Sequence, residues 1–451
     1  MSKTYRPWNP GQSWLLPPSP RDWLPERDLV YFVLDAVAEL DLSAITEKYE
    51  REERGYPPYH PRMMVTLLLY SYTQGVFSSR RIMKRGERDA AYRVIVQSDV
   101  PDFRTISDFR KLHLKELEGL FVQVLRLCQK AGLVKLGHVA LDGTKIKANA
   151  SRHKAMSYGR MKEEEQRLRK EIRELLAQAE STDAAEDQEH GRDRRGDELP
   201  EELARRESRL QKIREARKAL EAEAKAAAEE ERRRRAEEAA QRGDEPRGGR
   251  KPAPVKDVPE DKAQYNFTDP ETSIMKTSNK GFDQCGNAQA VVDGANQVIV
   301  AADVTSEAND KRQFEPMVTQ AKHNVGRGRS LDKVSADAGY FSEENATWAE
   351  QNEIDAHLAT GRLKHHERVA PAPRGRPPDG LTLKERMARK LRTKKGRATY
   401  AKRKGIVEPV FGFIKRGLGF VQFLLNGVEK MRGEWRLVCT ASNLRKLWSC
   451  T

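Results

Sequence analysis

Apolar residues recur at helical spacing from residue 27 to residue 133. The clearest stretches are 27–42, 61–75 and 104–132, and the last predicts one long amphipathic helix that ends at Gly132. The pattern therefore predicts an all-α N-terminal domain over 27–133. Residues 1–26 hold three tryptophans and six prolines without any period, and we interpret them as a Trp/Pro-rich arm that packs on the body or on a partner.

The helix expected at 61–75 ends at a glycine, and a short basic helix is expected at 77–89 after a serine cap. A helix, a glycine turn and a basic helix are typical of helix-turn-helix DNA-binding modules. In that interpretation Arg80 and Arg81 contact DNA. An ordinary helical bundle, with both arginines on a solvated face, fits the same pattern.

Residues 155–261 have a different pattern. Two series of apolar residues follow heptad-like spacing, and a polar turn with Pro200 separates them. We interpret this segment as an insertion that forms an antiparallel coiled-coil helical hairpin, either structural or for dimerisation. From Ala222 onward the composition is low in complexity, which favours a helix that frays into a linker.

Strand patterns flank the insertion. The run 139–141 leads into Asp142, and 284–304 alternates around Asp293-Gly294, a strong hairpin signal. Further on, a helix, a strand ending at Asp337, another helix and a third strand precede the C-terminal helices. Without the insertion the order is βββαβαβα, which predicts a mixed α/β, ribonuclease-H-like core over 134–154 plus 262–451.

That topology brings three acids to one region. The first and fourth strands lie side by side at the centre of such a sheet, so Asp142 and Asp337 are expected at one rim, with Glu408 on a helix that crosses it. Carboxylates that converge in this way are tolerated when cations lie between them. Oxygen ligands favour Mg²⁺, with Mn²⁺ as a substitute, and two such ions suit phosphodiester chemistry. Asp293, Asp303 and Asp332 are the nearest competing acids.

The charge of the chain also favours an anionic partner such as nucleic acid. The chain of 451 residues has a net charge of +15 and a pI near 9.5, which favours nucleic acid or an anionic membrane. Residues 361–404 hold 16 basic and three acidic residues, typical of a patch that follows a DNA backbone. No apolar run is long enough for a membrane span, so we expect a cytoplasmic, nucleoid-associated protein. Four scattered cysteines argue against a zinc site or a disulfide framework.

Five ordered motifs carry a resemblance to a known family. The chain resembles a bacterial insertion-sequence transposase of the DDE type, within the IS4/IS5-like superfamily and closest to the IS1182 family. The resemblance implies that Asp142, Asp337 and Glu408 form the metal-binding catalytic triad. It also implies that water frees the 3′-OH at the transposon ends, which then attacks target DNA. The matching stretches are ALDGTKIKANASRHKAMSY, NFTDPETSIMK, QVIVAADVTSEANDK, SADAGYFSEEN and RKGIVEPVFGFIKR.

The family signature around the glutamate is Tyr-x2-Arg-x3-Glu-x6-Lys. Lys415 lies seven residues after Glu408, as the signature requires, but Lys404 occupies the arginine position, and Tyr400 and Arg403 are each one residue out of register. Lysine still binds phosphate but lacks the bidentate fork of arginine. A second departure is that the insertion follows the first strand instead of preceding the final catalytic helix.

Besides these residues, Lys145 and Lys147 are candidates for phosphate contact, although both also fit a solvated face. The expected partners are double-stranded DNA, as terminal inverted repeats and as target, and a second copy of the chain, because two ends must be brought together. Two other functions fit parts of the sequence. One is a ribonuclease-H-like nuclease or resolvase without strand transfer, and the other is a non-enzymatic, basic coiled-coil DNA-binding protein.

Overall fold

The structure is a computed structural model of the chain. It divides into two compact units, one of residues 1–149 with 286–451 and the other of residues 150–285. The arm expected at 1–26 lies almost wholly outside the described residues. The structure describes residues 22, 24–51, 57–97, 99–190, 201–242, 254–277, 281–326, 328–361, 370–372, 375, 378 and 380–450.

Helices make up the described N-terminal region, as the apolar spacing predicts. Asp28 caps the first helix by accepting a hydrogen bond from the Val30 amide at 2.9 Å, and Pro61 occupies the first turn of the third. Gly75 then turns the chain with a φ of +69°, which favours glycine. The helices are α1 (Leu29–Ala38), α2 (Ser43–Glu50), α3 (Pro61–Thr73), α4 (Ser79–Arg88), α5 (Ala90–Val96), α6 (Phe103–Leu112) and α7 (Leu114–Lys130).

The single helix predicted over 104–132 is wrong, because α6 and α7 are separate. The chain breaks at His113, whose backbone leaves the helical region at φ −107° and ψ 25°. The His113 side chain is buried and lies within hydrogen-bonding distance of the Tyr49 hydroxyl, at 2.9 Å, with its ring against that of Phe109. These tertiary contacts favour the break, whereas apolar spacing continues across it and gives no local signal.

The main unit is built on a mixed sheet in which the strands follow the order β6-β5-β1-β7-β8. The strands are β1 (Val139–Lys147), β5 (Phe282–Asp293), β6 (Ile299–Thr305), β7 (Lys333–Ala336) and β8 (Asp355–Leu358). β5 and β6 form the antiparallel hairpin predicted around Asp293-Gly294, whereas β1 pairs in parallel with β7, and β7 with β8. This order is consistent with the predicted ribonuclease-H-like core.

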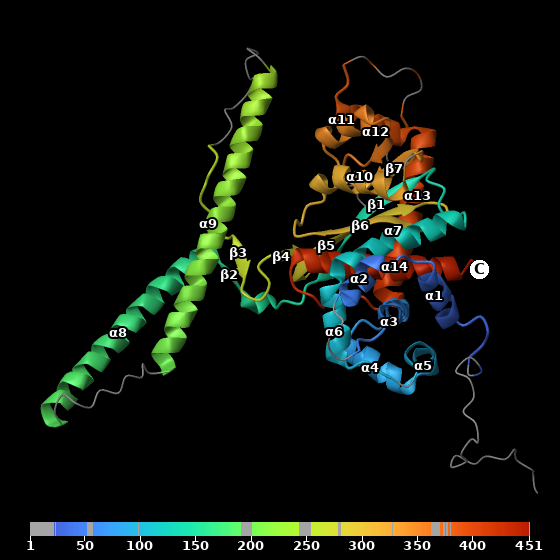
Figure 1. Ribbon diagram of the computed structural model, residues 1–451. Helices are drawn as coiled ribbons and strands as arrows, with labels where there is room; N and C mark the ends of the chain where they lie inside the picture. The colour runs from blue at the N-terminus through green and yellow to red at the C-terminus, as the bar shows by residue number, and fades with distance from the viewer. Residues whose placement is uncertain are drawn as a thin grey trace, which may run out of the picture. The chain divides into compact units, whose positions relative to one another are not determined.

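Helices cover the sheet (Figure 1). Val139 and Leu141 of β1 belong to a buried cluster with Val334 of β7 and with residues of α7 and α10. Because side chains alternate along a strand, Asp142 faces the opposite side, where α13 packs. The remaining helices are α10 (Phe314–Val325), α11 (Glu343–Gln351), α12 (Leu383–Arg392), α13 (Lys394–Gly412) and α14 (Val428–Trp448), with short 3₁₀ turns at Arg152–Lys154 and Lys311–Gln313 and a π-helical turn at Phe413–Gly417.

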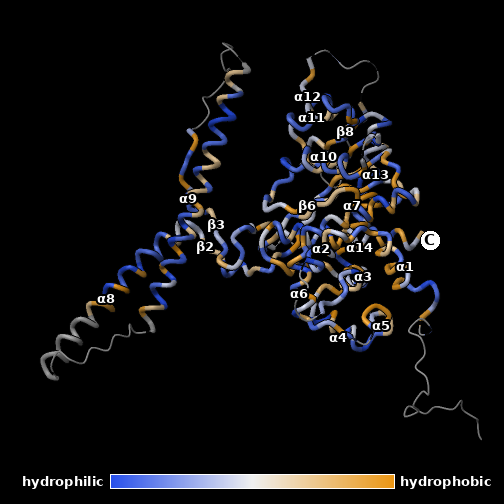
Figure 2. Tube along the Cα trace, viewed as in Figure 1, coloured by the Kyte–Doolittle hydropathy of each residue, from blue (hydrophilic) through white to orange (hydrophobic). Residues whose placement is uncertain are grey.

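The second unit contains two long helices, α8 (Tyr158–His190) and α9 (Glu201–Arg242). In Figure 2 the tube through them is mostly hydrophilic, with hydrophobic positions at intervals. Those positions meet in one cluster, which includes the residues of the two predicted apolar series: Met161, Leu168, Ile172 and Leu175 on α8, and Leu203, Leu210, Ile213 and Leu220 on α9. Three strands complete the unit: β2 (Ala155–Ser157) and β3 (Gln264–Asn266), which pair with each other, and β4 (Ser273–Lys276), which pairs with Phe282–Cys285.

The helix predicted to extend beyond Ala222 continues to Arg242 as part of α9, and the start of the predicted linker lies outside the described residues. The last turns of α9 consist of strong helix formers, and Glu231 pairs with Arg235 four residues on, at 2.8 Å. The boundaries of the compact unit, 150–285, are also wider than the insertion predicted at 155–261, because β2 and β3 join its two ends. In the described parts of both units, no helix is long and apolar enough to cross a membrane.

Candidate active site

Asp142 and Asp337 lie beside each other on the two central parallel strands. β1 and β7 are in register at Leu141 and Ala336, and each aspartate follows directly. Both carboxylates are fixed by backbone amides close to them in the chain: Asp142 accepts from Gly143 at 2.9 Å, and Asp337 accepts from Gly339 at 2.8 Å. Strand pairing thus brings together two acids that are 195 residues apart in the sequence (337 − 142).

The Asp142 carboxylate is in an environment that disfavours its charge. Burial raises its pKa from 3.8 to about 6, the cation of Arg403 opposes this shift, and the negative charge of Asp337 adds to it. Arg403 Nη1 donates to Asp142 Oδ2 at 3.0 Å, and only 10% of the Arg403 side chain is exposed. In this arrangement an arginine supplies the positive charge that the two aspartates need.

A third aspartate, which the sequence did not single out, lies next to this pair. Asp310 Oδ1 accepts hydrogen bonds from Asn287 at 2.6 Å, from Gln289 at 2.8 Å and from Lys145 at 3.4 Å. Tyr340, which is fully buried, donates to Gln289 Oε1. Asp310 comes from the loop before α10 and does not end a strand, so strand patterns gave no signal for it.

Gly339 keeps the space between Asp337 and Asp310 open. A Cβ atom at this glycine would lie 3.0 Å from Asp337 Oδ1 and 3.3 Å from Asp310 Oδ2. The two oxygens are therefore at most 6.3 Å apart (3.0 + 3.3). Close by, the buried Asn287 Oδ1 lies against Gly143 and has no hydrogen-bond partner in the part of the chain that the structure describes. The cluster is thus rich in oxygen atoms.

Glu408 does not join this cluster. It lies on α13 five residues after Arg403, which corresponds to a rotation of about 140° around the helix axis. Arg403 faces β1 and is buried, whereas Glu408 is exposed. The rotation and the exposure together place the Glu408 side chain on a different face of α13 from Arg403, whose guanidinium contacts Asp142. The assignment of Glu408 as the third member of the triad therefore remains a proposal.

Lys415 does reach β1. Its ammonium group contacts Thr144 Oγ1 and lies 3.3 Å from the Lys145 carbonyl oxygen. It belongs to the π-helical turn at Phe413–Gly417, in which the Leu418 amide bonds to the Phe413 carbonyl at 2.8 Å. A π-turn takes up one extra residue. In the family signature three residues separate the arginine from the glutamate, whereas four separate Arg403 from Glu408. The extra residue in the π-turn compensates for this difference, so Lys415 lies on the same face as Arg403.

The other predicted DNA contacts lie in several places. Tyr400 is beside Arg403, with the guanidinium 5.8 Å from its ring centre, and burial raises the pKa of its hydroxyl. Lys404 and Lys147 are exposed. Arg80 and Arg81 are exposed on α4, in the N-terminal helical region.

The two aspartates fit a divalent cation as a pair. They offer oxygen donors only, which Mg²⁺ prefers. Burial is the main cause of the raised pKa of Asp142, and a cation between the two carboxylates would offset the repulsion from Asp337 that adds to it. Within the described ranges, however, no three Asp, Glu, His or Cys side chains are grouped closely enough to hold one ion. A third carboxylate ligand would have to approach from its present position.

The competing acids have other roles. Asp293 lies at the β5–β6 turn, where its side chain accepts from the amides of Leu136 at 2.8 Å and Ala295 at 3.2 Å. Asp303 is on β6, and its side chain forms an ion pair with Arg432. In the described sheet, β6 pairs with β5 alone. Asp332 is exposed before β7.

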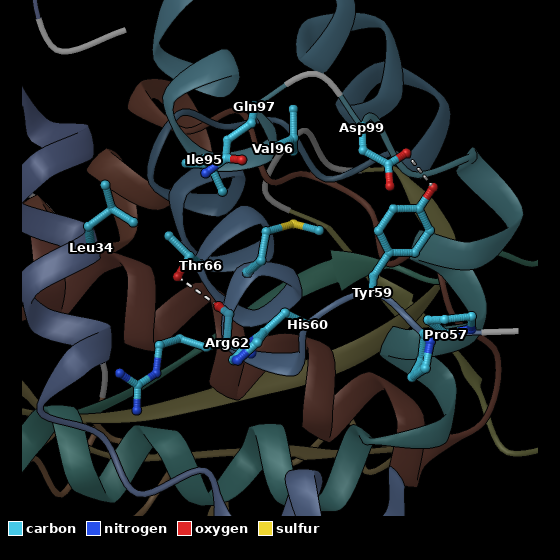
Figure 3. Close-up of a pocket in the computed structure, with 12 residues that line it drawn as sticks. Leu34, Pro57, Tyr59, His60, Arg62, Thr66, Ile95, Val96, Gln97 and Asp99 are labelled. Carbon is cyan, nitrogen blue, oxygen red and sulfur yellow. Dashed lines mark hydrogen bonds between the residues drawn. The ribbon is translucent and has the colours of Figure 1, made fainter. Parts of the chain in front are cut away.

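A separate hollow lies in the N-terminal helical region, and none of the predicted site residues lines it (Figure 3). Tyr59, one of its lining residues, donates to Asp99 at 3.2 Å. Leu34, Met63 and Ile95 supply apolar surface from α1, α3 and α5. Its lining shows no arrangement of catalytic groups, so the aspartates on β1 and β7 remain the candidate active site.

Comparison with known families covers part of this site, since Asp337 lies inside a match and Asp142 lies between two matches. Residues 254–444 match the model of the transposase DDE domain, which covers Asp310, Asp337 and Glu408. Residues 18–112 match a transposase domain (DUF772), which covers α1 to α6. No curated protein and no solved structure is similar enough to add to these matches. Taken with the mixed sheet and the paired aspartates, the two matches indicate that the chain carries a transposase DDE domain and, ahead of it, a second transposase domain.

Proposed function

We propose that this protein binds the terminal inverted repeats of its insertion sequence, cleaves them by metal-dependent hydrolysis and joins the freed 3′-OH ends to target DNA. The observation that carries the proposal is the pair Asp142 and Asp337 on adjacent central strands, inside a chain with two transposase matches. The five motifs described above favour the IS1182 family in particular.

In this proposal Asp142 and Asp337 hold Mg²⁺, for which Mn²⁺ substitutes, and two ions act together. Bound there, Mg²⁺ supplies charge stabilisation for the attacking and leaving oxygens. Glu408 is the proposed third ligand, on the strength of the family signature. Asp310 competes for that role, because its Oδ2 already faces Asp337 across Gly339.

The basic residues around the pair are proposed to hold the DNA backbone. Lys145, on β1, pairs with Asp310, and Lys415 lies against the same strand. The exposed Lys147 and Lys404 extend the positive surface. Arg403 and Tyr400 form the border nearest Asp142. We further propose a homodimer, because transposition joins two ends, and a coiled-coil role for α8 and α9 in pairing the subunits.

The test is cleavage of a duplex that carries the element's own ends, with Mg²⁺ and with products separated on a denaturing gel. Asp142→Asn and Asp337→Asn should abolish cleavage and leave end binding, measured by mobility shift, nearly unchanged. Asp332→Asn is the matched control, since Asp332 is exposed outside the cluster. Near-normal cleavage by either site variant would contradict the assignment.

Glu408→Gln and Asp310→Asn then decide the third ligand. The ligand variant should lose cleavage together with Mn²⁺ binding, measured by electron paramagnetic resonance, whereas the other should keep Mn²⁺ binding. If the wild-type protein releases 3′-OH ends that are never joined to a second duplex, the nuclease or resolvase alternative is correct.

A further inference from the structure

A basic groove lies on the N-terminal helical region, where the start of α4 meets α6. Four cationic side chains line it: Arg80 from α4, and Arg104, Arg110 and Lys111 from α6. One acid lines it as well, Asp108, whose carboxylate is 3.5 Å from the ammonium of Lys111 and is largely exposed. An exposed pair of this kind is weak, so the groove keeps a strongly positive balance.

The first turn of α4 opens into this groove. Ser78 is the N-cap and Ser79 the first helical residue, and both line the groove. The Ser78 side chain makes no capping hydrogen bond in the described structure. The first amide groups of a helix have no partner within the helix and carry a partial positive charge, so they attract anions.

Arg110 supplies an independent sign of a missing ligand. Only 4% of this residue is exposed, and its Nη1 donates to the Tyr72 hydroxyl at 3.1 Å and to the Phe77 carbonyl at 3.0 Å. Its Nε has no hydrogen-bond partner within the described residues. A buried, unsatisfied guanidinium donor is costly. Because Arg110 lines the groove, its guanidinium charge would attract an anion bound there, and that attraction would offset part of the cost.

Arg80 and Arg104 are already oriented at the edge of the groove. Their guanidinium carbons lie 4.9 and 5.6 Å from the centre of the Phe103 ring. Contact with an aromatic face restricts a long side chain, so less conformational entropy is lost when the arginine binds an anion. The groove thus combines restrained cations, serine hydroxyls and a helix N-terminus, which suits a phosphate group.

We propose that this groove binds a backbone phosphate of double-stranded DNA and that α4 approaches the duplex with its N-terminus. This inference rests on the proposed function and deepens it, since it assigns backbone contact, not base recognition, to the residues around Arg80. Contacts to phosphates position a protein on DNA without reading the sequence. A small anion such as inorganic phosphate offers the same chemistry, so the experiment must distinguish it from DNA.

The experiment measures binding of the full-length protein to a fluorescent duplex by anisotropy, in EDTA and over a range of salt concentrations. The variants are Arg104→Gln and Lys111→Gln, whose side chains are exposed enough to leave folding intact. Arg88→Gln is the control, an exposed arginine at the other end of α4 that does not line the groove. A duplex with the element's end and a scrambled duplex of equal length are compared.

We expect each groove variant to weaken binding to both duplexes by a similar factor, roughly tenfold, and to reduce the slope of log K against log salt by about 0.9 per lost phosphate contact. Arg88→Gln should leave the slope unchanged. An unchanged slope in both groove variants would overturn the proposal. So would a loss confined to the specific duplex, which indicates base recognition, or a change only in competition by inorganic phosphate, which indicates a small-anion site.

These outcomes can be separated from failure of the proposed function. If the wild-type protein neither binds nor cleaves its own ends, the transposase proposal itself fails. If it does both, and Asp142→Asn blocks cleavage while the groove variants bind DNA with the normal slope, only the groove inference fails.

Discussion

The Asp142→Asn variant should be more stable than the wild-type protein when no metal is bound. Asp142 is buried beside Asp337, and its pKa is raised to about 6 even though Arg403 pairs with it. The ionised carboxylate therefore destabilises the metal-free fold at neutral and alkaline pH. Asparagine has nearly the same shape and carries no charge, so it removes this cost together with the proposed catalytic function.

The size of the effect follows from the shift in pKa. The change from 3.8 to about 6 corresponds, at 1.36 kcal/mol per unit, to about 3 kcal/mol. Since the pKa in the folded state is the higher one, the wild-type protein has its full stability below pH 3.8 and loses this contribution as the pH rises through 6. The side chain is 22% exposed, so solvent screening is modest. The variant should therefore gain about 3 kcal/mol at pH 8 and only about 1 kcal/mol at pH 4.5.

The assay is urea unfolding in EDTA, followed by tryptophan fluorescence, at pH 8 and at pH 4.5. Trp435 is buried in the main unit and reports on its unfolding. Adding Mg²⁺ at about 100 times its Kd should stabilise the wild-type protein by about 2.7 kcal/mol and should stabilise the variant much less. The reasoning is refuted if Asp142→Asn is no more stable than wild type at pH 8, or if the control Asp332→Asn gains as much.

Three further predictions follow from single residues. Gly339→Ala places a Cβ between the carboxylates of Asp337 and Asp310. It should slow cleavage at least tenfold, which raises the activation free energy by roughly 1.4 kcal/mol or more, and it should weaken Mn²⁺ binding. Gly361→Ala, with open space around it, is the control. Glu165→Gln removes a carboxylate that pairs with Arg169 on α8 and with Arg214 and Arg217 on α9. This variant should destabilise the unit by about 1–3 kcal/mol, measured by thermal melting. Burial raises the pKa of Glu434 to about 7, above its usual 4.5, so the melting temperature of the wild-type protein should fall as the pH rises from 5 to 8.5. Glu434→Gln should flatten that profile. Equal slopes of melting temperature against pH in the two proteins would contradict the prediction.

The order of the strands could be predicted from the sequence because it depends on period and chain order. Alternation around Asp293-Gly294 predicts a hairpin, and apolar runs before Asp142 and Asp337 predict buried strands. The sheet confirms both, with Leu141 opposite Ala336. Proximity of the two aspartates follows from this register. β7 ends at Ala336, just before Asp337, whereas β1 continues past Asp142 to Lys147, so the predicted strand end at Asp142 is wrong.

Other parts of the site depend on tertiary contacts that have no local pattern. Asp310 sits in a loop, and its importance appears only when Asn287 and Gln289, from β5, donate to it. The break at His113 depends on contact with Tyr49, 64 residues away in sequence. Apolar spacing describes which face of an element is buried, but it does not describe which loop residue meets that face.

The position of Glu408 shows how one residue can change the charge of the site. Arg403 and Glu408 are five residues apart, so an α-helix cannot turn both side chains toward Asp142 at once. For Glu408 to reach the aspartates, this part of α13 would have to rotate by more than a third of a turn, and Arg403 would leave. That exchange replaces one positive charge by one negative charge, a change of −2, which a single divalent cation balances. On the proposal that Glu408 is a ligand, the site with the first of the two ions bound would carry the same local charge as the site with the ion pair between Arg403 and Asp142. The π-turn at Phe413–Gly417 is the place where the helix register differs from a regular α-helix.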